Sequence, residues 1–135
     1  MTKACIQYLK DHQEDFLEQL MEYLRIPSVS AQSDHADDIQ SCSDWLVAHC
    51  KTIGLKTRKI KTAGNPVVIA QTPRKGKSKK PHFMVYGHYD VQPIDPIKEW
   101  ENDPFKPNVK IISGEKAIVA RGASDDKGQL MTFIE

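Results

Sequence analysis

The N-terminal third of the chain carries two helical patterns of apolar residues. From Ile6 to Leu24, apolar positions recur every three or four residues with charges between them, which predicts an amphipathic helix that Pro27 ends. A second helix is predicted with Ser33 as its N-cap and Gly54 at its C-terminal cap. Its expected buried stripe consists of Ile39, Cys42, Trp45, Leu46 and Ile53.

The middle of the chain carries extended patterns. Residues 55–61 and 66–72 are predicted to be strands on either side of a turn at residues 63–65. Residues 82–86 include the unbroken apolar run Phe-Met-Val-Tyr. Because this run does not alternate with polar residues, it predicts a third strand that is fully buried.

The last third begins with a long connection, because residues 93–108 contain four prolines. Residues 110–113 and 117–120 then predict a hairpin, and a helix is predicted from Asp126 onward. The whole pattern predicts an α/β fold in which helices flank a mixed sheet. The final helical pattern reaches Glu135 without a capping residue, so we expect an N-terminal piece of a longer protein.

Composition limits the class of protein. The 135 residues suit one domain, and 39% hydrophobic with 27% charged residues is typical of globular proteins. No apolar run approaches the roughly 20 residues of a membrane-spanning helix. The N-terminus does not resemble a secretory signal, and the three cysteines form no CxxC pair. These features predict a cytoplasmic protein.

The net charge of +1 is unevenly distributed, since residues 51–80 contain 10 basic and no acidic side chains. The densest part, residues 72–81, is bounded by prolines and is expected to be a solvated loop. Nucleic-acid binding by this segment is the alternative. It is disfavoured because no aromatic residues are interleaved to stack on bases.

Two polar clusters carry the candidate chemistry. The first follows the predicted strand 82–86, where His88 and Asp90 share one side of an extended chain. Open α/β sheets place active sites at the carboxyl ends of their strands. An imidazole nitrogen can bind zinc, and a neighbouring carboxylate can orient the ring. A purely structural histidine is the alternative for this cluster alone.

The second cluster, residues 120–129, follows a predicted strand and opens a helix, so we expect it at the same sheet edge. Its adjacent carboxylates, Asp125 and Asp126, repel each other, and a divalent cation would relieve that repulsion. The alternative is helix capping, which Ser124 and both aspartates also suit.

Together, the clusters resemble the metal motifs of the M20 family of metallopeptidases, and in particular its dipeptidase branch of carnosinase-like and PepV-like enzymes. Residues 87–93, Gly-His-Tyr-Asp-Val-Gln-Pro, resemble the first motif, and residues 121–128, Arg-Gly-Ala-Ser-Asp-Asp-Lys-Gly, resemble the second. Residues 24–30 are similar to an N-terminal signature of the family. Trp100 with residues 103–105 resembles the segment between the motifs.

The resemblance implies specific roles. His88 would be a ligand to one zinc ion, and Asp125 would bridge two. Asp90 would orient the His88 ring and support catalysis. The implied cofactors are two divalent metal ions, zinc in the first place, with manganese or cobalt as alternatives. The family also implies a cis peptide bond between Asp125 and Asp126.

The family's general-base glutamate, its remaining metal ligands and its lid domain are missing from residues 1–135. We therefore expect an incomplete N-terminal part of an M20-like catalytic domain that is inactive alone. The intact enzyme would hydrolyse amide bonds in dipeptides or short peptides, and could form a homodimer through a domain not present here. No nucleic-acid or membrane partner is expected. The alternatives are an N-acyl-amino-acid deacylase of the same family and a truncated, non-catalytic interaction module.

Overall fold

The computed structural model describes residues 2–73, 76 and 81–135 of the chain. Four α-helices and two short 3-10 helices are present in this part of the protein. The α-helices are α1 (Lys3–Asp11), α2 (Gln13–Leu24), α3 (Ala36–Thr52) and α4 (Lys127–Ile134), and the 3-10 helices are η1 (Ser33–His35) and η2 (Ile97–Glu99). None of the described helices is long and apolar enough to cross a bilayer.

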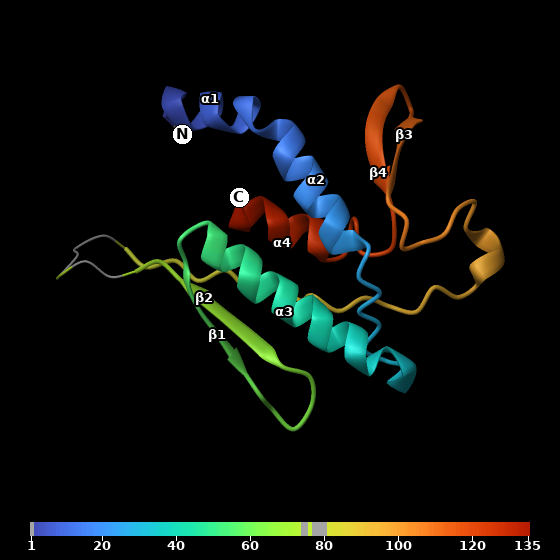
Figure 1. Ribbon diagram of the computed structural model, residues 1–135. Coiled ribbons are helices and arrows are strands. Elements are labelled where there is room, and N and C mark those ends of the chain that lie inside the picture. The colour runs from blue at the N-terminus through green and yellow to red at the C-terminus, as the bar shows by residue number, and fades with distance from the viewer. Residues whose placement is uncertain (1, 74–75, 77–80) are drawn as a thin grey trace.

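The strands form two separate antiparallel pairs. β1 (Lys56–Ile60) pairs with β2 (Val67–Gln71), and β3 (Asn108–Ile112) pairs with β4 (Glu115–Val119). Both hairpins occur where the sequence predicts them. The β3–β4 hairpin projects away from the helices (Figure 1).

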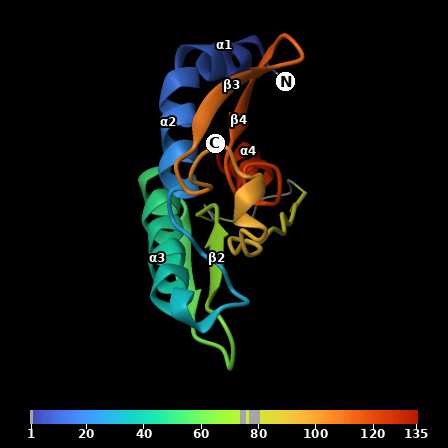
Figure 2. The same ribbon diagram turned by 90° about the vertical axis from the view of Figure 1, so that its right-hand side faces the viewer.

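Helix α3 packs along the β1–β2 hairpin, and α2 contacts both α3 and α4 (Figure 1, Figure 2). Burial of apolar side chains between these elements is the main stabilising force. The principal core cluster is formed by Tyr23, Cys42, Leu46, Cys50 and Met131. Cys42, which the sequence predicts on the buried stripe, is therefore buried on the inner face of α3, and so is Cys50.

The first helical segment is divided at His12. The backbone of His12 leaves the helical region, with φ −111° and ψ 14°, so that α1 ends and α2 begins around it. Its ring Nδ1 lies 3.1 Å from a carboxylate oxygen of Asp15 in the first turn of α2. The prediction of one continuous helix from Ile6 to Leu24 is therefore wrong at this residue.

The start of the second helix also differs from the prediction. Ser33 does not cap α3, because residues 33–35 form the 3-10 turn η1 and His35 occupies the N-cap position. The His35 ring contacts the Asp38 carboxylate at 2.7 Å. At the other end, Gly54 adopts φ +85°, which favours glycine and suits the predicted C-terminal cap. Ile53 is 40% exposed, because it lies beyond the last helical turn.

The predicted buried strand at residues 82–86 is wrong. Phe83, Met84 and Tyr86 are 88%, 92% and 89% exposed, and no strand is formed there. A fully buried strand needs neighbours on both edges, and no described strand pairs with this segment. The chain forms a parallel bridge only further on, between Val91 and Val29. The expected single mixed sheet is thus replaced by two small antiparallel sheets in the described residues.

The basic segment 72–81 falls mostly outside the described residues. The predictions of a solvated loop and of nucleic-acid binding there are therefore not tested by the structure.

Candidate metal centre

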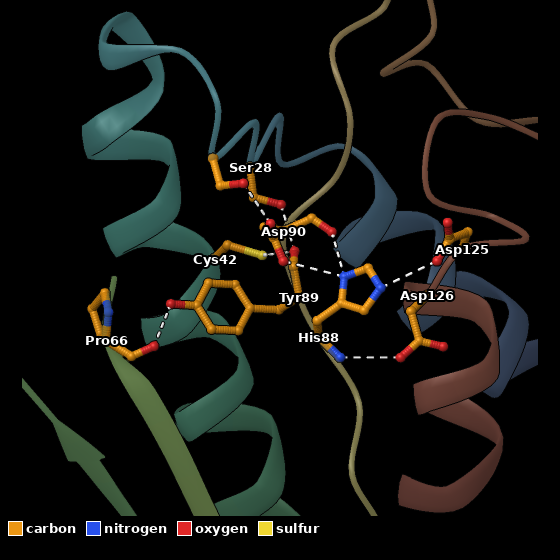
Figure 3. Close-up of polar contacts among 9 residues, drawn as sticks. Ser28, Cys42, Pro66, His88, Tyr89, Asp90, Asp125 and Asp126 are labelled. Carbon is orange, nitrogen blue, oxygen red and sulfur yellow. Dashed lines mark hydrogen bonds and ion pairs between the residues drawn. The ribbon is translucent and has the colours of Figure 1, made fainter. Parts of the chain in front are cut away.

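The His88 ring lies between two carboxylates (Figure 3). Its Nδ1 is 3.1 Å from Oδ1 of Asp90, and its Nε2 is 3.1 Å from Oδ1 of Asp125. The side chains are 43% exposed at His88, 38% at Asp90 and 80% at Asp125, so the group opens to solvent on the Asp125 side. The two polar clusters of the sequence therefore meet at this ring.

The surroundings of the ring indicate its tautomer. Nδ1 faces two acceptors, the backbone carbonyl of Asp90 and its carboxylate, so the ring proton belongs on Nδ1. In the neutral imidazole, Nε2 then presents a lone pair towards the Asp125 carboxylate. Because Nε2 of His88 and Oδ1 of Asp125 both offer lone pairs and lie 3.1 Å apart, a proton or a cation between them is favoured.

The pKa of His88 follows from this arrangement. Partial burial lowers it, but the hydrogen bond with the Asp90 backbone, the Asp90 charge and the contact with Asp125 raise it. The net result is a pKa raised above the ordinary value of 6.5. The positively charged ring is thus favoured when no metal ion is bound.

Asp126 supports the same site from the start of α4. Its Oδ2 accepts a hydrogen bond from the backbone N–H of His88 at 3.0 Å, which ties the two motifs together (Figure 3). Gly87 permits this close approach, because a Cβ there would lie 2.8 Å from Asp126 Oδ2 and 2.9 Å from a Leu130 methyl carbon. The peptide bond between Asp125 and Asp126 is cis, as the family resemblance implies.

Residues 28–30, which follow α2, form hydrogen bonds with residues 89–91 of the first motif. The hydroxyl of Ser28 donates to the Tyr89 carbonyl at 2.6 Å, and the Val91 N–H donates to the Ser28 carbonyl at 2.9 Å. The hydroxyl of Ser30 donates to Oδ2 of Asp90 at 2.5 Å. Backbone and side-chain hydrogen bonds thus align residues 28–30 with residues 89–91.

The Tyr89 side chain points away from the His88 ring, towards α3 and β2 (Figure 3). Its hydroxyl donates to the Pro66 carbonyl at 2.6 Å, and its backbone carbonyl also accepts from the Cys42 thiol at 3.6 Å. Burial raises the pKa of Tyr89 to about 12. Tyr89 therefore anchors the motif while its neighbours His88 and Asp90 face the site.

Lys127 is the first residue of α4, and its side chain is fully buried. Its Nζ donates to the carbonyls of Tyr23 at 3.0 Å and Ile26 at 2.7 Å, and lies 4.8 Å from the centre of the Tyr23 ring. Burial lowers the pKa of its ammonium group. These carbonyls lie at the C-terminal end of α2, where helix carbonyls lack intrahelical partners. Lys127 therefore fixes the second motif to that helix end.

The donor chemistry at His88 and Asp125 suits a divalent cation such as zinc, which binds imidazole nitrogen and carboxylate oxygen. The number of donors is too small, however, since zinc takes four ligands and the described residues contain no group of three or more metal-binding side chains. The described residues thus supply two donors of the kind that zinc binds, but not a complete metal site. Asp90 contacts the opposite ring nitrogen and is placed to orient the ligand.

The structure brings together all three residues singled out in the sequence, namely His88, Asp90 and Asp125. It does not place them at the edge of one shared sheet, because residues 82–86 form no strand. Sequence reasoning missed Ser30 and the support from Lys127. Both lie inside the segments that resemble family motifs, which is the one signal that could have marked them.

Comparison with known proteins bears on this arrangement. Residues 84–135 match the model of Peptidase family M20/M25/M40. This part of the chain is similar to the M20 family. The match includes both polar clusters of the candidate site, so the family resemblance seen in the sequence is confirmed.

M20 relatives also match outside this segment. The Cys-Gly metallodipeptidase DUG1 of Candida albicans is 28% identical over 132 residues, which cover 88% of this chain and 26% of that protein. The succinyl-diaminopimelate desuccinylase of Parvibaculum lavamentivorans is 30% identical over 122 residues, which cover 89% of this chain and 28% of that protein. The chain therefore spans little more than a quarter of the length of these relatives.

The fold matches that of an M20 dipeptidase. The structure of the dipeptidase Dug1p from Saccharomyces cerevisiae superposes with a TM-score of 0.81 at 24% identity, over 95% of this chain and 28% of that one. The predicted fold class, part of a peptidase-like α/β catalytic domain, is confirmed by this match.

Proposed function

We propose that residues 1–135 are an incomplete N-terminal part of an M20-like catalytic domain. The protein to which they belong hydrolyses amide bonds in dipeptides or short peptides with the help of divalent metal ions. The observation that carries the proposal is the His88 ring held between Asp90 and Asp125, inside the segment that matches the family. The dipeptidase relatives support this substrate class.

In this proposal His88 and Asp125 hold metal, and Asp90 keeps the ring proton on Nδ1 so that Nε2 is free to bind. The imidazole and carboxylate donors favour zinc over harder ions such as magnesium. When bound, a pair of such ions polarises the scissile carbonyl and lowers the pKa of a water molecule. The remaining ligands and the general base come from outside these 135 residues. The chain alone is therefore expected to be inactive.

Deacylation of N-acyl amino acids is the second candidate, because it uses the same chemistry. The specific observation in its favour is the 30% identity to a desuccinylase. We identify no substrate-binding residue among the described residues that would favour dipeptides over N-acyl amino acids.

The test is hydrolysis of Cys-Gly and of N-succinyl amino acids by the intact protein, before and after metal removal with a chelator. We expect Cys-Gly cleavage that disappears on chelation and returns with zinc. His88→Ala and Asp125→Ala should each lower kcat at least about 100-fold, because each removes a ligand. Cleavage of the succinyl substrate alone would establish the deacylase. Cleavage of neither substrate would refute both candidates and favour the interaction module.

We also propose a cytoplasmic location, since the cysteines Cys5, Cys42 and Cys50 are free. A homodimer formed through parts of the intact enzyme beyond these residues belongs to the same proposal. Small peptides are its proposed partners, with no role for nucleic acid or membranes.

A further inference from the structure

The carboxylate of Asp90 uses its two oxygens for two different partners. Oδ1 faces His88 Nδ1 at 3.1 Å, and Oδ2 accepts the Ser30 hydroxyl at 2.5 Å. A carboxylate that contacts only a histidine can rotate about its χ2 angle and lose that contact. A second hydrogen bond to the other oxygen fixes the plane of the group.

Ser30 itself is held in register with Asp90 by the backbone. Val29 and Val91 form a parallel bridge, and the Val91 N–H donates to the Ser28 carbonyl at 2.9 Å. The Ser28 hydroxyl, two residues before Ser30, binds the Tyr89 carbonyl and also contacts the Cys42 side chain. Of these two serines, then, Ser30 contacts the carboxylate that orients His88, and Ser28 contacts groups on the other side of the motif.

The sequence of contacts therefore runs from Ser30 to Asp90, then to His88 and finally to Asp125. We propose that Ser30 is a positioning residue of the metal centre, which acts through Asp90 to hold His88 in the Nδ1–H tautomer with Nε2 turned towards the metal. This inference rests on the proposed function, because it assumes that Nε2 binds metal. The inference adds Ser30 to the site, although Ser30 lies 60 positions before Asp90 in the chain.

Ser28 and Ser30 offer a matched pair of variants. Ser30 is exposed and Ser28 is fully buried, so Ser28→Ala is expected to perturb folding stability more than Ser30→Ala. Only Ser30→Ala removes a contact to the Asp90 side chain. Ser30→Thr keeps a hydroxyl and serves as the rescue variant.

The first measurement is the tautomer of His88, from long-range ¹H–¹⁵N spectra of the metal-free full chain at a pH above the His88 pKa. We expect the Nδ1–H form to dominate in the wild type, in Ser28→Ala and in Ser30→Thr. Ser30→Ala should show a mixture of the two tautomers. A merely structural role for Ser30 would leave this signature unchanged.

The second measurement is calorimetric titration with Zn²⁺ alone of the intact protein that contains this chain, with the same substitutions. Ser30→Ala should bind about 10-fold more weakly, the lower end of the usual effect of residues behind a metal ligand. Ser28→Ala and Ser30→Thr should stay within about 2-fold of the wild type. His88→Ala should abolish the binding.

The outcomes separate the two proposals. If His88→Ala binds Zn²⁺ as the wild type does, the metal site of the proposed function is wrong, and the role of Ser30 fails with it. If His88→Ala loses binding while Ser30→Ala matches Ser28→Ala in tautomer and affinity, only the Ser30 inference is overturned.

Discussion

At the scale of single residues, the proposed metal ligand His88 is held in place by the carboxylates on either side of its ring. Each ring nitrogen faces a carboxylate oxygen at 3.1 Å, so the site attracts a proton as well as a cation. The raised pKa of His88 is the consequence. If Nε2 binds metal as proposed, protons and metal ions compete for it.

The Asp125→Asn variant tests this competition. Loss of the carboxylate charge beside Nε2 should lower the pKa of His88, which NMR titration of its ring resonances would measure directly. In the wild type the folded-state pKa is raised, so protonation of His88 stabilises the fold below about pH 6.5. That contribution disappears as the pH rises through the folded-state pKa. An unchanged His88 pKa in Asp125→Asn would contradict the assignment.

Gly87→Ala tests the close approach between the two motifs. The added methyl would collide with the Asp126 carboxylate and with a Leu130 methyl carbon, and a shift of the carboxylate would break its hydrogen bond with the His88 N–H. We expect a loss of about 1–3 kcal/mol in the free energy of unfolding, the usual cost of overpacking. Urea denaturation would measure it.

Gly64→Ala is the matched control, because the nearest atom to a Cβ there is 4.0 Å away. It should change stability by less than about 0.5 kcal/mol. Equal stability of the two alanine variants would show that Gly87 is not constrained by Asp126.

The residues of the site differ in how far the sequence could predict them. His88, Asp90 and Asp125 could be singled out because their two clusters resemble motifs of the M20 family, although each cluster alone also had a structural interpretation. Ser30 was not, since a serine after Pro27 is typical of any turn. Its role depends on the pairing of residues 28–30 with residues 89–91, which no local pattern encodes.

At the scale of elements, the predictions succeeded where an element's partner is close in the sequence. The β1–β2 and β3–β4 hairpins each combine two extended runs with a short turn, so local patterns are sufficient to place them. The predicted strand 82–86 failed because its pairing depends on strands elsewhere. The segment is apolar, as the sequence shows, but apolar composition alone does not determine whether another strand lies beside it to form hydrogen bonds.

The contact between α4 and α2 leads to a prediction for Lys127→Met. Methionine keeps much of the aliphatic volume, but it leaves the carbonyls of Tyr23 and Ile26 without the Nζ donor. Each carbonyl keeps a backbone donor, Ile26 N–H for Tyr23 and Ser28 N–H for Ile26. Since a hydrogen bond from a charged donor contributes about 1.5–3 kcal/mol, loss of the two should make unfolding easier by about 2–5 kcal/mol. Chemical denaturation would measure the change.

Lys116→Met, on the exposed part of β4, is the control for loss of a lysine charge. It should be nearly neutral, because surface substitutions usually have small effects. If both methionine variants unfold at the same denaturant concentration, Lys127 does not stabilise the end of α2.

At the scale of the whole molecule, the chain exposes an apolar strip at Phe83, Met84 and Tyr86. This strip borders a groove of about 970 Å³ that is lined by β2, residues 82–90 and the end of α4. Three large apolar side chains exposed so close together in the sequence favour association.

The 135-residue chain should therefore bind a hydrophobic dye such as ANS and self-associate as its concentration rises. Replacing Phe83, Met84 and Tyr86 by serine should reduce both effects, as dye fluorescence and analytical ultracentrifugation would show. Ile111→Ser, at an exposed position on the separate β3–β4 hairpin, is the control. It should leave both signals nearly unchanged, and an equal reduction by the control would contradict a specific role for the strip.

The bond from Lys127 to Tyr23 joins positions 104 apart in the chain. During synthesis on the ribosome, all residues of α2 are released long before Lys127, the residue that binds the end of this helix, has been synthesised. Until then, the Tyr23 carbonyl accepts only from its own neighbourhood, through the N–H of Ile26. The corner that holds His88 and Asp125 is consequently assembled late, once the earliest and latest segments of this chain have met.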